Sequence, residues 1–183
     1  MVEIETKIDE IDLKDAEGAL RKIGAKFVEK KLFRRWVFSL PEKSGEDRFV
    51  RLRTDGKTST LTYKRRFGDG LANTEEIETE VKNFDAVAKI LSSLILEPLY
   101  QENRRTVYSF EDVEISIDEW PKLLPIMEIE ADSEAKVRDA LNKLNIKGKE
   151  LGNIGWEKVY AMHGMDLRSF KILKFDDKEE KYD

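Results

Sequence analysis

The 183-residue sequence predicts an α+β fold in which about eight strands, mostly joined by hairpins, form an antiparallel sheet or barrel with helices packed outside it. Three observations support this prediction. Apolar and charged side chains alternate along many short segments, as they do in strands with two different faces. Turn signals such as Asp55-Gly56 separate neighbouring segments of this kind. A few other segments carry apolar residues at helical spacing.

The first half of the chain is expected to hold a strand, a helix, four more strands and a second helix. Residues 2–9 form the first strand, and Asp12 and Gly24 mark the start and the end of the first helix. The apolar face of that helix carries Leu13, Ala16, Leu20 and Ile23. The next strands are expected at residues 26–39, 48–54, 58–67 and 73–81. Asn83 caps the second helix, whose apolar residues are Phe84, Val87, Ile90, Leu91 and Leu94.

The second half is expected to continue with strands and to end in helices. Strands at 100–110 and 113–120 form a hairpin, and a further strand occupies 126–131. Ser133 caps a third helix, and the last helix begins near Asn153. No repeat or linker divides the chain. The sequence therefore predicts a single domain over residues 1–170 and a charged C-terminal tail over 171–183.

Composition excludes several classes of function. The net charge is −5, which disfavours nucleic-acid binding through bulk electrostatics. The chain has no cysteine, so disulfides and thiolate chemistry are excluded, and His163, its single histidine, is interpreted as structural. Any metal must therefore be held by oxygen, which favours Mg²⁺ or Mn²⁺. No signal peptide or membrane-spanning run is recognisable, so a cytoplasmic protein without membrane contact is expected.

The charged faces of the predicted strands are sorted by sign. Arg51 with Arg53, and Lys64 with Arg66, occupy two neighbouring strands. Carboxylates occupy three others, which carry Glu76, Glu78 and Glu80, then Glu114 and Asp118, then Glu128 and Glu130. A sheet face in solvent would show the same alternation, but it tolerates mixed signs. The sorting favours the alternative, in which the charged faces turn inward.

Inward-facing charges would make a closed barrel with a charged lumen. The lumen would hold the cations Lys7, Arg51, Arg53, Lys64, Arg66 and Arg105. It would also hold the carboxylates Glu3, Glu5, Glu78, Glu80, Asp118, Glu128 and Glu130. Buried charges at this density need compensation, which a polyphosphate with Mg²⁺ would supply for both signs. Removing one carboxylate, such as Glu128 or Glu130, is then expected to relieve repulsion in the empty site.

The sequence resembles the CYTH domain family, also called triphosphate tunnel metalloenzymes. The family signature Glu-x-Glu-x-Lys matches "EIETK" at residues 3–7. Later segments follow in family order, namely "RLR" (51–53), "LTYKRR" (61–66), "EIETEV" (76–81), "NRRTVY" (103–108), "ISIDEW" (115–120) and "MEIE" (127–130). The resemblance covers roughly residues 2–170. It implies an eight-stranded antiparallel closed barrel, a tunnel that binds triphosphate with a divalent metal.

The resemblance also assigns roles to residues. It implies that phosphate is bound by Lys7, Arg51, Arg53, Lys64 and Arg105, with Arg66 on the same face as Lys64. The expected metal ligands are Glu3, Glu5, Asp118, Glu128 and Glu130, with Glu78 and Glu80 near the same site. Glu5, Lys7 and Glu80 are the expected catalytic residues. The expected partner is a small molecule that contains a triphosphate. The sequence does not decide between a monomer and a homodimer.

Three functions are consistent with this resemblance. The first is a metal-dependent triphosphatase acting on inorganic triphosphate, thiamine triphosphate or a nucleoside triphosphate. The second is a class IV-type adenylyl cyclase, and the third is a non-catalytic polyphosphate or nucleotide-binding module. Cyclases of that class often carry His-Phe before the signature, whereas only Met1 and Val2 precede it here. The sequence also departs from the family at Asn103, where a lysine is common, so one phosphate contact is in doubt.

Overall fold

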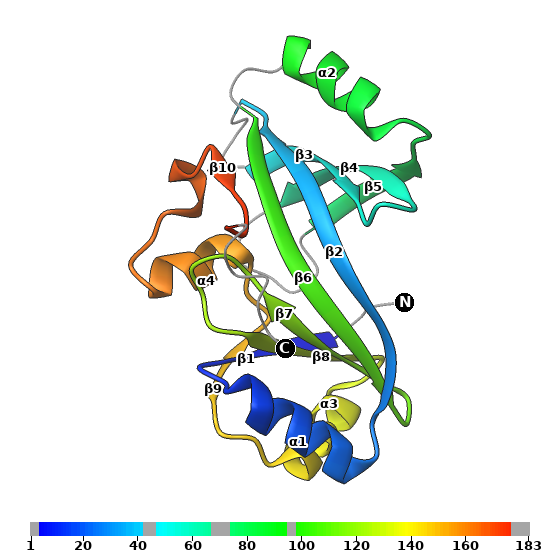
Figure 1. The fold of residues 1–183 in the computed structure, drawn as a ribbon, viewed down its shortest axis with the longest axis vertical. Coiled ribbons are helices and arrows are strands. Elements are labelled where there is room, and N and C mark those ends of the chain that lie inside the picture. The colour runs from blue at the N-terminus through cyan, green and yellow to red at the C-terminus, as the bar shows by residue number, and fades with distance from the viewer. Residues whose placement is uncertain (1–3, 42–46, 67–73, 95–97, 177–183) are drawn as a thin grey trace. The chain divides into compact units, whose positions relative to one another are not determined.

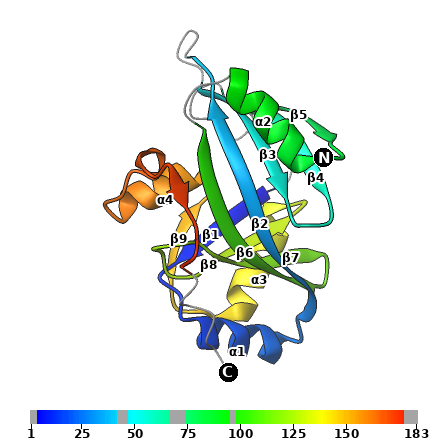
Figure 2. The same ribbon diagram turned by 45° about the horizontal axis from the view of Figure 1, so that its top comes forward.

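The computed structural model describes residues 4–41, 47–66, 74–94 and 98–176 (Figures 1 and 2). The chain divides into two compact units. The first contains residues Met1–Lys31 and Asn103–Leu167, and the second contains Leu32–Glu102 and Arg168–Asp183. Two long strands, β2 (Lys26–Ser39) and β6 (Leu99–Phe110), contribute residues to both units.

The first unit is an antiparallel sheet with helices. Its strands are β1 (Ile4–Asp9), β7 (Val113–Glu119), β8 (Ile126–Ala131) and β9 (Lys149–Gly152), together with residues of β2 and β6. Its helices are α1 (Leu13–Ile23), α3 (Glu134–Leu144) and α4 (Trp156–Met162). The strands lie in the order β6-β7-β8-β1-β9. The N-terminal strand therefore pairs with β8 and β9, which follow it by more than a hundred residues.

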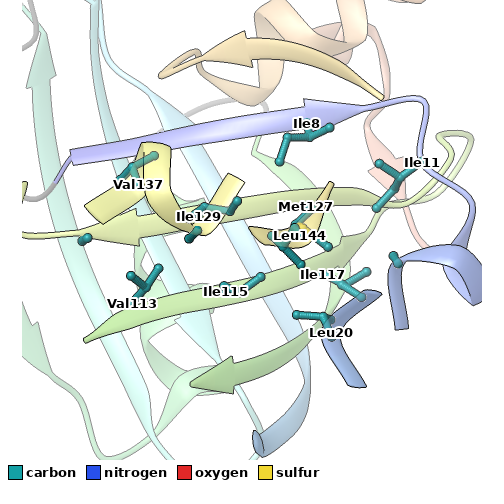
Figure 3. Packing of buried hydrophobic residues seen from close by; sticks show 13 residues of the cluster. Ile8, Ile11, Leu20, Val113, Ile115, Ile117, Met127, Ile129, Val137 and Leu144 are labelled. Carbon is teal, nitrogen blue, oxygen red and sulfur yellow. The ribbon is translucent and has the colours of Figure 1, made fainter. Parts of the chain in front are cut away.

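The core of this unit lies between the apolar faces of the strands and two helices. Ile8 of β1, Ile115 and Ile117 of β7, and Met127 and Ile129 of β8 are all buried (Figure 3). Helix α1 contributes Ala16 and Leu20 to the same cluster, and α3 contributes Val137, Ala140 and Leu144. Alternation in the strands and helical spacing in α1 and α3 place these residues on facing surfaces. The expected packing of helices against the apolar strand faces is therefore confirmed in this unit.

The predicted helix caps are confirmed in two of three cases. The Asp12 side chain accepts hydrogen bonds from the backbone N–H groups of Lys14 and Asp15, and Gly24 ends α1 with φ 80°. Asn83 accepts a hydrogen bond from the backbone of Ala86 in the same way. Ser133 occupies the cap position of α3 but makes no side-chain cap hydrogen bond.

The second unit contains the remaining strands and one α-helix. They are β3 (Asp47–Thr54), β4 (Ser59–Arg66), β5 (Thr74–Glu80), α2 (Phe84–Leu94) and β10 (Ile172–Leu173). A 3₁₀ turn at Leu167–Ser169 begins at the last residue of the first unit. Strands β5, β4, β3 and β2 are adjacent and antiparallel, and β10 pairs in parallel with the start of β6. The core here contains Phe38 of β2, Leu52 of β3 and Ala88 of α2.

The antiparallel sheet with helices is confirmed, but the closed barrel is not. In the part of the chain that the structure describes, β5 pairs only with β4, and β9 pairs only with β1. Hydrogen bonds therefore do not close the sheet. Strands β9 and β10 add to the eight expected; they have four and two residues, too few to show an alternation. None of the helices in these ranges is both long and apolar enough to cross a membrane.

Candidate functional site

Charged side chains are buried on one face of the first unit's sheet. Lys7 of β1, Asp118 of β7 and Glu128 of β8 are 3%, 0% and 6% exposed. A strand whose charges lie in water would leave such side chains exposed. The alternative in which the charged strand faces lie in solvent is therefore excluded at Lys7, and these charges must be compensated inside the protein.

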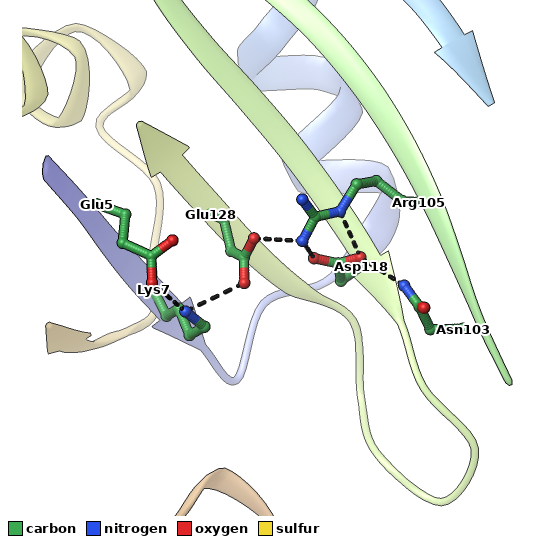
Figure 4. A network of polar contacts seen from close by, with 6 residues as sticks. All are labelled: Glu5, Lys7, Asn103, Arg105, Asp118 and Glu128. Atoms are coloured by element: carbon green, nitrogen blue, oxygen red, sulfur yellow. Dashed lines mark hydrogen bonds and ion pairs between the residues drawn. The ribbon is translucent and has the colours of Figure 1, made fainter. Parts of the chain in front are cut away.

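The compensation is a continuous network that centres on Glu128 (Figure 4). Glu128 Oε1 lies 3.1 Å from Lys7 Nζ, and Glu128 Oε2 accepts a hydrogen bond from Arg105 Nη2. Lys7 also donates to Glu5 Oε1 at 2.9 Å. Arg105 donates to Asp118 through both Nε and Nη2, so it holds that carboxylate with two parallel hydrogen bonds. Glu128 thus lies between two cations.

Strand register explains why these residues meet. In the pairing of β1 with β8, Lys7 lies opposite Glu128. In the pairing of β6 with β7, Arg105 lies opposite Asp118. Directly opposite residues have their Cβ atoms about 5 Å apart, so long side chains reach each other easily.

The network keeps Lys7, Glu128 and Arg105 charged. Burial would lower the pKa of Lys7, but Glu128 and Glu5 outweigh burial and raise this pKa above its ordinary value of 10.5. Burial would raise the pKa of Glu128, but Arg105 and Lys7 outweigh it and hold this pKa below its ordinary value of 4.5. Burial also opposes the charged form of Arg105, yet Asp118 and Glu128 raise its pKa. All these groups are therefore ionised at neutral pH.

These shifts predict a dependence of stability on pH. Because the pKa of Glu128 is lower in the folded than in the unfolded protein, its contribution is complete well above pH 4.5 and is lost as pH falls through the folded value. Lys7 has the opposite sign: its contribution is complete well below pH 10.5 and is lost as pH rises through its raised pKa. We expect urea unfolding to show Glu128→Gln less stable than wild type at pH 7, with the gap closing below about pH 4. A gap that stayed constant down to pH 3 would contradict a charged Glu128.

Both cations keep capacity to donate further hydrogen bonds. Within the described ranges, Arg105 Nη1 makes no hydrogen bond, whereas Nε and Nη2 are engaged by Asp118 and Glu128. The Arg105 side chain is 27% exposed. Two of the three ammonium hydrogens of Lys7 suffice for Glu5 and Glu128, and the ring of Trp156 is centred 6.0 Å from Nζ. The arrangement leaves donors that an oxyanion could accept.

A second group of charges lies on β3, β4 and β5 in the second unit. Lys64 Nζ is 2.7 Å from Glu76 Oε2, and Arg51 Nη2 is 3.6 Å from both Glu76 Oε1 and Glu78 Oε2. Thr62 donates a 2.6 Å hydrogen bond to Glu78 Oε2. That bond is the main cause of the lowered pKa of Glu78, which burial partly opposes. These glutamates are more than a third exposed, so their ion pairs with Arg51 and Lys64 are weak.

The guanidinium groups at the start of this sheet contact aromatic rings. Arg53 lies 4.8 Å from the centre of the Phe33 ring, and Arg34 lies 5.8 Å from that of Phe84. Arg35 is opposite Arg53 in the β2–β3 register and is only 8% exposed. Arg35 therefore belongs to a packed surface and not to a freely solvated strand, whereas Arg34 is exposed.

The structure distributes the predicted site residues over the two units. The first unit holds Glu5, Lys7, Arg105, Asp118, Glu128 and Glu130. The second holds Arg51, Arg53, Lys64, Glu78 and Glu80. Glu80 is exposed at the end of β5, opposite Thr60. Glu3 lies outside the described residues, and so does the side chain of Arg66, whose backbone ends β4.

The first unit carries carboxylates of the type that the predicted metal ion prefers as ligands. Glu5, Glu130 and Glu114 lie directly opposite one another across β1, β8 and β7. Like charges in such positions repel each other, and carboxylate oxygens are the ligands that Mg²⁺ and Mn²⁺ prefer. Among the described residues, however, no three acidic or histidine side chains gather in a way that could hold a metal. The metal site therefore stays a prediction.

Some polar contacts of this unit were missed by the sequence analysis. His163 Nε2 lies 2.7 Å from Asp9 Oδ2, and Asp9 is 2% exposed. The alternation of Glu5 and Lys7 continues to Asp9 and could have indicated this residue. Asn103 of β6 donates to Asp118 Oδ1 of β7 at 2.9 Å. Alternation within one strand could not indicate this contact, because the two residues come from different strands.

Comparison with known proteins adds to this geometry. A family model of the CYTH domain matches residues 1–153. The chain is 25% identical over 173 residues to a Methanocaldococcus jannaschii protein named "Putative adenylate cyclase", covering 92% of this chain and 99% of that protein. A Pyrococcus horikoshii structure matches with a TM-score of 0.64 at 22% identity, covering 79% of this chain and 91% of that one. A Hippeastrum protein, described as a "putative adenylyl cyclase" with a dominant triphosphatase activity, matches with a TM-score of 0.60 at 14% identity, covering 88% and 96%.

Proposed function

Because this chain belongs to the CYTH domain family, we propose that it is a divalent-metal-dependent triphosphatase that hydrolyses a small molecule containing a triphosphate. The observation that carries the proposal is the buried network of the first unit. It combines two cations that have donors to spare with three carboxylates, Glu5, Asp118 and Glu128. Phosphate oxygens accept hydrogen bonds from such cations. The excess of carboxylates over cations suits a divalent metal ion that binds together with the phosphate.

Each side chain has a proposed task in hydrolysis. Arg105 Nη1 and the Lys7 ammonium donate to phosphate oxygens and balance the charge that develops on them. The Glu5 carboxylate shares the Lys7 ammonium through one oxygen and would take a proton from the attacking water with the other. A Mg²⁺ or Mn²⁺ ion, which Glu130 opposite Glu5 would help to hold, would withdraw charge from the phosphate oxygens. Arg51, Arg53 and Lys64 are the proposed phosphate contacts of the second unit.

An adenylyl cyclase is the second candidate. The Methanocaldococcus jannaschii relative carries that name, and cyclisation uses the same triphosphate but attacks its α-phosphorus with the ribose hydroxyl. The Hippeastrum protein, described by its dominant triphosphatase activity, shares the fold and favours hydrolysis as the first assay. A module that binds polyphosphate without reaction is the third candidate.

One assay separates the three candidates. The protein is incubated with inorganic triphosphate, ATP or thiamine triphosphate, each with Mg²⁺, Mn²⁺ or EDTA, and the products are identified. Release of orthophosphate that EDTA abolishes supports the triphosphatase. Cyclic AMP with pyrophosphate indicates the cyclase. Saturable binding without any product indicates the binding module. If the protein neither binds these triphosphates nor forms a product from them, the proposal is contradicted.

Arg51→Ala tests the second unit. The glutamates that pair with Arg51, Glu76 and Glu78, are more than a third exposed, so losing these pairs should change the free energy of unfolding by less than about 1 kcal/mol. Loss of a charged hydrogen bond to phosphate should raise KM for inorganic triphosphate about tenfold or more. Lys57→Ala, on an exposed turn between β3 and β4, is the control and should change neither value. An unchanged KM in Arg51→Ala would show that Arg51 has a structural role in the sheet and does not contact the substrate.

A further inference from the structure

Asn103 is a buried amide in direct contact with the charged network. It lies on β6, is 2% exposed, and donates from Nδ2 to Asp118 Oδ1 at 2.9 Å. Asp118 itself is completely buried. A buried carboxylate needs several donors to remain ionised, and Asn103 supplies one without adding a charge.

The amide and the arginine hold the same carboxylate in complementary ways. Asp118 Oδ1 accepts from Asn103 Nδ2 and also from Arg105 Nε at 2.9 Å, while Oδ2 accepts from Arg105 Nη2 (Figure 4). The two parallel bonds to Arg105 keep the guanidinium coplanar with the carboxylate. The bond from Asn103 opposes rotation of that carboxylate. The orientation of Arg105 therefore depends on Asn103, although the two side chains need not touch.

We propose that Asn103 is a positioning residue that acts through Asp118 to set the direction of Arg105 Nη1 toward a phosphate oxygen. The identity of this ligand rests on the proposed function. Nη1 is the guanidinium nitrogen without a hydrogen bond in the described part of the chain, so a rotation of the guanidinium would move this donor most directly. The amide is neutral, so the network keeps three carboxylates against two cations, which suits phosphate bound together with a divalent metal.

A double-mutant cycle on binding tests the proposal. The Kd for inorganic triphosphate in Mg²⁺ is measured by calorimetry for wild type, Asn103→Ala, Arg105→Lys and the double variant. We expect Asn103→Ala to weaken binding about tenfold in the wild-type background and less than about twofold in the Arg105→Lys background. The two effects should be coupled because Asn103 and Arg105 both contact Asp118. Equal weakening in both backgrounds would overturn the proposal, since Asn103 would then act independently of Arg105.

A second measurement needs no ligand. The Nε–H signal of Arg105 is followed by ¹⁵N NMR in the free protein and assigned by its loss in Arg105→Lys. It should shift in Asn103→Ala and stay in place in Gln101→Ala, which removes another buried amide of β6. A signal that does not move in Asn103→Ala would overturn the positioning role. Asn103→Ser, with a smaller polar group, replaces the alanine variant if that variant does not fold.

The two measurements separate the inference from the function on which it rests. A wild-type protein that does not bind triphosphate would overturn the proposed function, and the NMR comparison alone would then decide the role of Asn103. Triphosphate binding with an unmoved Arg105 signal would leave the function standing and remove the inference.

Discussion

Glu128→Gln is expected to lower the free energy of unfolding by about 3 kcal/mol at pH 7 and to reduce metal-dependent turnover at least about 100-fold. Glutamine keeps the size of the side chain but removes the charge that Lys7 and Arg105 share. Its NH₂ group would also point a donor at one of these two cations. Both cations are largely buried, so solvent cannot replace the lost carboxylate.

This expectation reverses the one that the charges alone suggest. In a crowd of carboxylates the loss of one anion relieves repulsion, whereas Glu128 lies between two cations and its loss leaves them to repel each other. Glu114→Gln is the matched control, because Glu114 is exposed on the neighbouring strand β7. It should change stability by no more than about 0.5 kcal/mol. A Glu128→Gln protein as stable as this control would show that the network does not contribute to the free energy of unfolding.

Arg105→Ala is expected to have the second large effect. It removes the guanidinium that pairs with Asp118, a fully buried carboxylate that Asn103 also contacts, and one of the two partners of Glu128. Breaking a buried ion pair from one side typically costs about 3–5 kcal/mol. We therefore expect a large drop in the urea midpoint, or failure to fold at 37 °C. Asp118→Asn combined with Arg105→Ala should recover part of the loss, because it also removes the stranded charge.

Arg105→Lys separates binding from stability. Lysine keeps the positive charge but cannot hold Asp118 and present a further donor in one plane. The Kd for inorganic triphosphate in Mg²⁺ should rise about tenfold or more, with a smaller loss of stability than in Arg105→Ala. Arg104→Lys is the control, since Arg104 lies on the other face of β6. Triphosphate binding as tight as wild type in Arg105→Lys would contradict a phosphate contact at Arg105.

Local sequence patterns predicted most of the elements because their causes are local. Alternation of apolar and charged residues located β8, and the cap at Asp12 with the stop at Gly24 located α1. The same patterns placed Lys7 and Glu128 on charged strand faces. Closure of the sheet into a barrel could not be predicted in this way, because it depends on which strand edges meet.

The sequence by itself determined which residues share a face, and only the tertiary structure decided which of them meet. Lys7 lies opposite Glu128 and not Glu130, although both glutamates are on the same face of β8. Sliding one strand by two residues leaves every side chain on its own face, so alternation cannot distinguish these registers. The packing of the whole core and the ladder of backbone hydrogen bonds select one of them. For that reason the sequence could supply the charges, but the sharing of Glu128 by Lys7 and Arg105, and the contact of Asn103 with Asp118, appear only in the folded chain.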